Sequence, residues 1–326
     1  MDGEVKYHLE ATQLGDAWDS FVSTSPNSTA FVYSKYLEAL QVNVQPYYCY
    51  KKQELMGAVL CILSKDSNRI IGHEYVIYDG LMYRDLSHLN QSQRFSEEFK
   101  IQQCVAQSLA EIYSEIRLSL HPTIIDIRPF LWVNYTKKTS RYVPDIRYTS
   151  YVSISDFKHA KKLDDIGRYK DASVARRQEI RYSQKKNVNT EQVADSALFI
   201  SYYKKTMARQ GINNSSHILN NMKELLHTLL SNKSCVMIQS SDSEGRVGSM
   251  AIFLLDQRRA YYLFGANDPK MRSQHTGTAV LWDSFYLLAD LGFLEVDLEG
   301  INSPNRGWFK LSFGGSCVPY YVMNFE

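Results

Sequence analysis

The sequence lacks the features that would indicate a disulfide framework, a metal centre or a hydrolase of the common types. Its five cysteines are scattered over 326 residues, are odd in number and include no C-x-x-C pair. This pattern indicates reduced thiols rather than disulfides or a zinc site. The eight histidines show no H-x-x-x-H or H-x-x-E-H spacing, and no G-x-S-x-G motif occurs. Metal-dependent and serine-dependent hydrolysis are therefore disfavoured, and we expect no metal site.

A strong charge of one sign and a long apolar run are also missing. The net charge is +2 and the isoelectric point is near 8.1, too balanced to indicate nucleic-acid binding by itself. We expect no DNA partner. The longest apolar runs, such as residues 57–63, are too short to cross a bilayer, and the first residues do not have the pattern of a signal peptide. We therefore expect a cytoplasmic protein without a transmembrane segment, for which peripheral contact with a membrane remains open.

The residues that are present predict an α/β fold of about two domains. Hydrophobic residues make up 44% and charged residues 22%, which is enough for a packed core. Apolar periodicity predicts helices at 13–22, 34–41, 95–118, 173–185, 198–209 and 218–230, and hairpins at 47–50 with 55–64 and 235–240 with 248–255. Strands are expected at 76–83, 123–127 and 148–154. The two halves follow a similar order of elements, which favours an internal duplication.

The clearest single unit is a strand–helix–strand segment near the C-terminus. Residues 260–265 alternate as a strand does, 278–291 are apolar as in a buried helix, and 293–298 form a second strand. Parallel strands joined by a helix leave a crevice at their carboxyl ends, where ligands bind. The polar residues of this segment gather at that end.

Three of those polar residues can carry out acid–base or electrostatic chemistry. Asp297 and Glu299 are two residues apart, so on a strand they share one face, and either could take a proton from an attacking amine. Lys310 follows Trp308 and Phe309 in an expected loop and could stabilise a carbonyl oxyanion. The alternatives are acids that only end a strand and a lysine that only lies on the surface.

Two further segments could hold phosphates. The turn with Gln274, Thr276, Gly277 and Thr278 lies between the strand and the helix, where backbone N–H groups and the helix N-terminus attract anions. An ordinary connecting loop is the alternative. Residues 158–186 contain ten Lys or Arg and four Asp or Glu, a local charge of +6, and place Arg177 and Arg181 on one helix face. A solvated charged face is the alternative.

These segments together resemble the FemAB/FemX-like acyltransferases, a group of GNAT fold that includes the BioF2-like acetyltransferase domains. The resemblance covers nearly the whole sequence and is carried by short motifs in the same order: Trp18-Asp19-Ser20-Phe21, Tyr78-Asp79-Gly80-Leu81, Asp126-x-Arg128-Pro129-Phe130, Gly265-Ala266-Asn267-Asp268-Pro269, Val296-Asp297-Leu298-Glu299-Gly300 and Phe309-Lys310-x-x-Phe313-Gly314-Gly315. The long coiled-coil arm of some members has no counterpart here.

The resemblance implies two tandem GNAT-like domains, 1–147 and 148–326, with mixed sheets flanked by helices and a shared cleft. The resemblance also implies that the last residues pack back on the first domain and that the cleft includes Tyr78, Asp79 and Trp308. The implied catalytic residues are Lys310 with Asp297 and Glu299, and the implied phosphate contacts are the 274–278 turn, Arg177 and Arg181.

The implied activity is N-acyl transfer from acyl-CoA to an amino group of a cell-envelope glycan precursor, such as a nucleotide- or lipid-linked amino sugar in polysaccharide biosynthesis. The first alternative is FemX-like transfer from aminoacyl-tRNA to a peptidoglycan precursor peptide, with tRNA the less favoured partner. The second is a GNAT-like module that binds a nucleotide sugar without catalysis.

Overall fold

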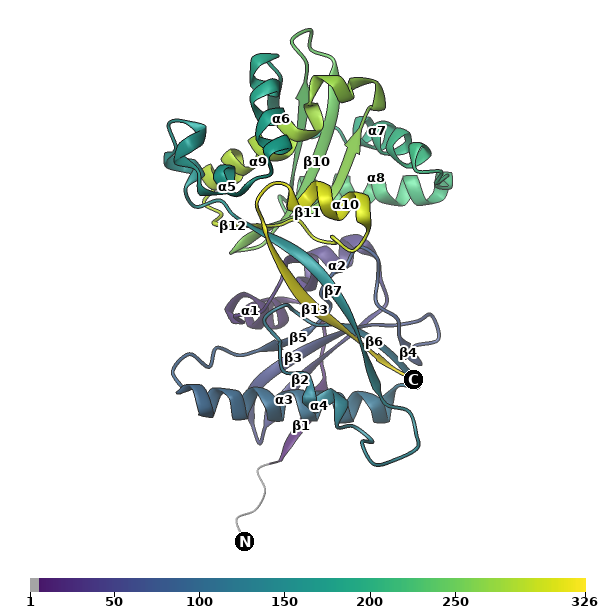
Figure 1. Ribbon diagram of the computed structural model, residues 1–326. Coiled ribbons are helices and arrows are strands. Elements are labelled where there is room, and N and C mark those ends of the chain that lie inside the picture. The colour runs from purple at the N-terminus through teal and green to yellow at the C-terminus, as the bar shows by residue number, and fades with distance from the viewer. Residues whose placement is uncertain (1–5) are drawn as a thin grey trace. The chain divides into compact units, whose positions relative to one another are not determined.

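The computed structural model describes residues 6–326, which divide into two compact units. The first unit contains residues 6–147 and 319–326, and the second contains residues 148–318. Two strands, β7 (Tyr142–Ser153) and β13 (Ser316–Phe325), belong partly to each unit. Figure 1 shows the elements of both. No helix among the described residues is long and apolar enough to cross a membrane.

The first unit is built from two sets of strands and four helices. One antiparallel sheet has the order β1-β2-β3-β5, and the other strands follow the order β4-β6-β13-β7. Helix α3 contacts β1, β2, β3 and β5 and covers their shared core (Figure 1). The elements are β1 (Tyr7–Ala11), α1 (Asp16–Thr24), α2 (Ser34–Leu40), β2 (Val44–Lys51), β3 (Glu54–Ile62), β4 (Arg69–Ile70), β5 (Leu81–Tyr83), α3 (Gln91–Ile112), β6 (Glu115–Ser119) and α4 (Arg128–Leu131).

The second unit is a mixed sheet with the strand order β7-β12-β11-β10-β9-β8 and helices packed on it. Strands β11 and β12 are parallel, and the other pairs are antiparallel. The elements are α5 (Gly167–Asp171), α6 (Val174–Lys185), β8 (Asn189–Val193), α7 (Ser196–Arg209), α8 (Ser216–Ser231), β9 (Cys235–Ser241), β10 (Val247–Leu255), β11 (Arg259–Asn267), α9 (Thr276–Asp290), β12 (Glu295–Asp297) and α10 (Pro304–Leu311).

Helix α9 holds this unit together because it is apolar on nearly every side. Val280, Leu281, Trp282, Phe285 and Leu288 are all buried in one cluster with the sheet. The helix contacts β9 and β10. Each of these side chains contributes about 1.5–3 kcal/mol on burial. The β11–α9–β12 connection is therefore a rigid element, and its ends have fixed positions within the unit.

Several expected elements are wrong in the first unit. The helix predicted over 95–118 ends at Ile112, and β6 begins at Glu115, because the burial of Ile116 and Leu118 alternates as in a strand. Residues 123–127 form no strand but a turn and a loop before α4. Of the strand predicted over 76–83, only β5 is regular.

Candidate active site

The site predicted in the second unit begins where β11 and β12 stop pairing. Their parallel ladder joins 259–261 to 295–297 and ends there. Strand β11 continues to Asn267, paired with β10 on its other side. The residues that follow β12 separate from β11 at the carboxyl end of the parallel pair, the end at which the sequence predicts a site. They stay beside β7, because the N–H groups of Leu298 and Ile301 donate to the Ser150 and Tyr148 carbonyls.

Asp297 and Glu299 are both buried at this end. Asp297 Oδ1 accepts hydrogen bonds from the Thr149 hydroxyl and, at 2.7 Å, from the backbone N–H of Glu299. Glu299 lies two residues after the end of β12, and its backbone is in the left-handed conformation, with φ 53°. Its Oε1 is buried without a hydrogen-bond partner among the described residues. Burial raises the pKa of Glu299 well above its usual range, the Asp297 charge raises it further, and Lys310 opposes both.

Lys310 reaches the same place from helix α10. Its Nζ donates to the backbone carbonyl of Glu299 at 3.3 Å and lies 5.2 Å from the ring centroid of Tyr262 on β11. Burial lowers the pKa of Lys310 to about 8, against the opposing effect of Glu299 and Asp297. The structure thus brings Lys310 and the two acids together.

The expected loop around Lys310 is wrong, because residues 304–311 form a helix. Pro304 occupies the first turn, where a missing N–H costs nothing. Gly307 faces the chain before it, and a Cβ at this position would come within 2.4 Å of the Ile301 carbonyl oxygen. Pro304 and Gly307 are usual signals of a loop. Here Pro304 starts the helix, and Gly307 allows the helix to pack closely on Ile301. Trp308 on the same helix is 76% exposed.

The turn predicted to hold phosphates has its hydroxyls turned inward. Thr276 Oγ1 bonds to Ser249 Oγ at 2.9 Å, and Thr278 Oγ1 donates to Glu179 at 2.6 Å. The N–H groups of Thr278 and Ala279 bond to the His275 carbonyl. The N–H groups of Thr276 and Gly277 have no acceptor among the described residues, as expected at a helix N-terminus. The backbone, rather than the side chains of Thr276 and Thr278, is what the turn offers to an anion. No hydrogen bond of the Gln274 side chain is found among the described residues.

A buried charged residue near this site that the sequence analysis did not single out is Arg176 on α6. It is 7% exposed, its guanidinium lies 4.5 and 4.4 Å from the rings of Phe309 and Phe313, and its Nε donates to Ser312 Oγ at 2.9 Å. It also bonds to the Thr278 hydroxyl. Arg176 therefore connects the start of α9 with the segment that carries Lys310. Helical spacing gave the signal, because residues 176, 180 and 183 share the buried face of α6.

The two arginines predicted on α6 are more accessible. Arg177 is half-buried, with no hydrogen bond or ion pair found among the described residues. Arg181 is exposed and donates to the Tyr169 hydroxyl at 2.8 Å. Neither contacts Lys310 or the acids in the hydrogen bonds of the unit.

The predicted cleft residues of the first unit lie in its interior. Tyr78 packs against Phe31 and Tyr320, with ring centroids 6.1 and 5.1 Å apart. Asp79 Oδ1 accepts from the Ser119 N–H at 2.6 Å, its Oδ2 has no partner among the described residues, and burial raises its pKa to about 7. Both are 1% exposed, so side-chain contact with a ligand would need local rearrangement.

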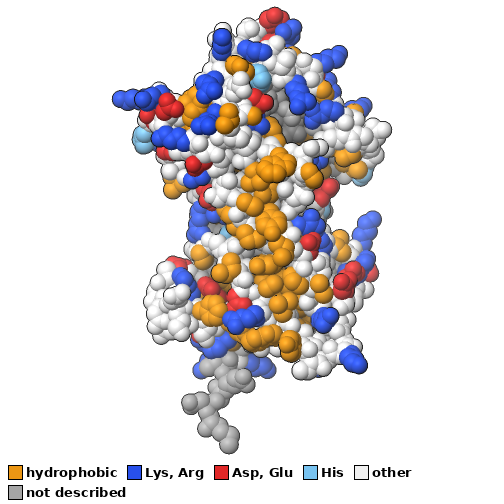
Figure 2. Space-filling view, in the orientation of Figure 1, with side chains coloured by type: hydrophobic (Ala, Val, Ile, Leu, Met, Phe, Trp, Pro, Cys, Tyr) orange, Lys and Arg blue, Asp and Glu red, His pale blue; other side chains and the backbone are white. Residues whose placement is uncertain are grey.

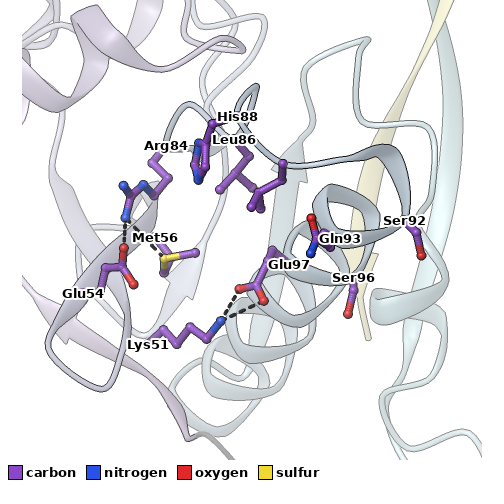
Figure 3. Close-up of a pocket in the computed structure, with 11 residues that line it drawn as sticks. Lys51, Glu54, Met56, Arg84, Leu86, His88, Ser92, Gln93, Ser96 and Glu97 are labelled. Carbon is purple, nitrogen blue, oxygen red and sulfur yellow. Dashed lines mark hydrogen bonds and ion pairs between the residues drawn. The ribbon is translucent and has the colours of Figure 1, made fainter.

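The first unit also has a cavity of about 380 Å³ that none of the predicted site residues lines. It lies between α3 and the β2–β3 hairpin (Figure 3). Its charges are internally balanced, because Lys51 Nζ bonds to both Glu97 oxygens at 2.8 and 2.9 Å and Arg84 pairs with Glu54. Figure 3 shows these two pairs on the cavity wall.

Comparison with known proteins agrees with this fold. Residues 170–308 match the family model of the acetyltransferase (GNAT) domain. The structure is similar to FemX, with a TM-score of 0.63, 12% identity and 96% of each chain covered. It is also similar to a tandem GNAT protein from the clavulanic acid biosynthesis pathway (TM-score 0.54, 8% identity, 98% of each chain) and to L-PGS from Bacillus licheniformis (TM-score 0.53, 10% identity, 94% of this chain and 90% of that one). A sequence search of curated proteins finds no match.

The chain therefore carries a GNAT acyltransferase domain within a FemX-like tandem GNAT fold, and the predicted fold class, family resemblance and enzyme class are confirmed. The matched segment contains β9 to β12 and most of α10, up to Trp308. Glu299 and Asp297 lie inside it, and Lys310 lies two residues beyond its end.

Proposed function

We propose that the protein is an N-acyltransferase that transfers an acyl group from acyl-CoA to an amino group of a cell-envelope glycan precursor, such as a nucleotide- or lipid-linked amino sugar. The observation that carries the proposal is the contact of Lys310 with Glu299 beside Asp297, at the carboxyl end of β12 in a GNAT domain. A cytoplasmic location, where acyl-CoA is made, fits this reaction.

In the proposed reaction the acceptor amine attacks the thioester carbonyl. A C–N bond forms, the carbonyl oxygen becomes an oxyanion, and collapse of the intermediate breaks the C–S bond and releases CoA as its thiolate. The Lys310 ammonium stabilises the oxyanion, because it lies in a partly buried place walled by the Tyr262 ring. The amine gives up one proton to a carboxylate of the enzyme.

Glu299 is the better of the two candidate bases. Asp297 Oδ1 already accepts two hydrogen bonds, one from the N–H of Glu299 itself, so its role is to fix the backbone that presents Glu299. Glu299 keeps a buried oxygen without a partner. Its raised pKa brings proton uptake closer to neutral pH, where a general base works best.

The donor would be held through its phosphates at the start of α9. The N–H groups of Thr276 and Gly277 face no protein acceptor, and helix N-termini attract phosphate. A Cβ at Gly277 would come within 3.0 Å of Asn267 Oδ1, so packing within the unit already favours glycine at this position. Arg177 and Arg181 would contact phosphates of the donor or the acceptor from α6.

The chief alternative is FemX-like aminoacyl transfer from tRNA to a peptidoglycan precursor peptide. The same three residues could perform that reaction, and the +6 charge of residues 158–186 could contact tRNA. A non-catalytic module that binds a nucleotide sugar is the second alternative. The half-buried Lys310 beside the buried Glu299 argues against this module, because ionisable groups with shifted pKa values gathered at one place are typical of catalytic sites.

The experiment combines ligand-induced thermal stabilisation with turnover. Under the proposal acetyl-CoA raises the melting temperature, and thiol is released when nucleotide-linked amino sugars are added. Stabilisation by a UDP-muramyl peptide with no response to acyl-CoA would support the tRNA-dependent alternative. Stabilisation by a nucleotide sugar with no transfer from either donor would support the binding module.

A further inference from the structure

An exposed aromatic and basic surface of the first unit has no part in the chemistry above. It surrounds α4 and the loop that follows, and we call it the α4 surface. Its exposed apolar residues include Ile125 (76%), Trp132 (51%) and Tyr135 (77%). The whole set is Phe95, Phe99, Ile125, Arg128, Trp132, Tyr135, Lys137, Lys138 and Arg141. Figure 2 shows hydrophobic side chains, with Lys or Arg among them, over the place of α3 and α4 in Figure 1.

Arg128 organises the aromatic part of the α4 surface. Its guanidinium carbon lies 5.7, 5.7 and 5.8 Å from the ring centroids of Phe95, Phe99 and Trp132. Two hydrogen bonds of 2.8 Å join the guanidinium to Asp126. The charge of Arg128 is therefore balanced, and the group serves to hold three aromatic rings together.

The basic part is a compact loop over residues 134–141. Asn134 Nδ2 donates to the Ser140 carbonyl at 2.8 Å, and the Lys137 N–H donates to the Asn134 carbonyl at 2.9 Å, so the loop is closed on itself. Residues 135–141 are all exposed. Residues 132–141 contain no Asp or Glu, and Lys137, Lys138 and Arg141 have no ion pair among the described residues. The loop thus carries three basic side chains in the same segment as Trp132 and Tyr135. Lys137 and Lys138 have no acidic neighbour in the loop, whereas the Arg141 backbone pairs with that of Glu326.

We propose that the α4 surface binds an anionic phospholipid membrane. Trp and Tyr favour the bilayer interface, where an apolar ring and a polar tip meet both phases. Lysine and arginine beside them are attracted to acidic headgroups, and their long stems cover apolar area. An acidic protein partner would match the same charges and rings, and absence of binding to the anionic vesicles would favour it. The inference does not rest on acyl transfer, and it would bring a lipid-linked acceptor to the enzyme.

The test is co-sedimentation of the full chain with vesicles, in the absence of any acyl donor or acceptor. Vesicles of phosphatidylcholine alone are compared with vesicles that also contain phosphatidylglycerol. We expect binding only to the second kind. The Lys137→Gln/Lys138→Gln variant should bind about 30-fold more weakly, since each charge near the surface contributes about fivefold. Trp132→Ala/Tyr135→Ala should also weaken binding.

Matched controls distinguish binding through the α4 surface from non-specific adsorption to vesicles. Lys65→Gln/Lys223→Gln removes two exposed lysines elsewhere, and Leu291→Ala/Leu294→Ala removes two exposed apolar side chains; both should bind as the parent does. In a Trp308→Phe background, Trp132 is the one strongly exposed tryptophan among the described residues, and its emission should shift to the blue on anionic vesicles.

Three results would overturn the proposal: no binding to the anionic vesicles, equal loss in the control variants, or no emission shift. A dimer in solution that Trp132→Ala/Tyr135→Ala dissociates would assign the surface to a second copy of the chain instead. Retained circular dichroism of each variant checks its folding. Acyl transfer could fail in a separate assay without changing any of these outcomes.

Discussion

Replacing Lys310 with methionine should lower activity and raise stability, a combination that a purely structural ion pair would not give. Methionine keeps most of the length of the side chain and removes the ammonium. The pKa of Lys310 falls from 10.5 to about 8 on folding, so the charged form is disfavoured in the folded state. At 1.36 kcal/mol for each tenfold change in proton affinity, this amounts to about 3 kcal/mol at neutral pH.

The gain should approach that value because Glu299 is not left as a bare charge. Burial and the Asp297 charge raise the pKa of Glu299, and Lys310 lowers it. Without Lys310, burial and the Asp297 charge raise the pKa of Glu299 unopposed and favour the neutral carboxyl further. The free energy of unfolding should therefore rise by up to about 3 kcal/mol. Acyl transfer should fall by about 10²–10³, the usual loss when one oxyanion-stabilising group is removed.

Urea denaturation followed by tryptophan fluorescence measures the first quantity, and release of CoA thiol measures the second. Trp282 is buried in the same unit and reports its unfolding. Lys270→Met, at an exposed lysine, should change neither. A Lys310→Met variant that is less stable but fully active would refute the reasoning and make Lys310 a structural partner of Glu299.

The other predictions concern the same cluster. The rate should fall as pH rises through about 8, because the Lys310 ammonium is then lost, and a pH profile of Lys310→Arg should lack this alkaline limb. The Glu299 carboxylate is protonated as pH falls through its raised pKa, which gives the pH profile an acid limb. Asp297→Asn should move this limb to lower pH, because the Asp297 charge raises the pKa of Glu299. A limb that stays in place would exclude Glu299 as the base. Arg176→Met should lower the free energy of unfolding by about 2 kcal/mol and raise the KM for acyl-CoA, because the start of α9 is then no longer joined to the segment that carries Lys310. Calorimetry measures the first effect and steady-state kinetics the second. Arg177→Met is the control.

The sequence predicted regular elements best where one periodicity ran without interruption. The expected helix over 173–185 is α6 (Val174–Lys185), with Ser173 accepting the N–H of Arg176 as its cap. The change at Tyr113 was missed, because Ile112 and Ile116 fit a helical spacing as well as they fit a helix end and a strand. Short apolar runs do not distinguish these cases.

The candidate site was predictable in its residue types and not in its geometry. The family motifs pointed to Lys310, Asp297 and Glu299. The left-handed backbone of Glu299 was not predictable, since a glutamate rarely adopts φ above zero without support from its surroundings. Arg176 was missed for the opposite reason: an arginine in a basic segment is usually solvated, and only packing on Phe309 and Phe313 makes it a buried one.

The return of β13 to the first unit has a consequence for how the protein folds during synthesis. Val322 to Phe325 pair with β6, and Met323 and Phe325 are buried in the core of the first unit. Those residues are translated after the whole of the second unit. On the ribosome the first 147 residues must therefore wait, with part of their core exposed, while residues 148–318 fold. For the first unit, the order of synthesis and the order of completion are therefore reversed.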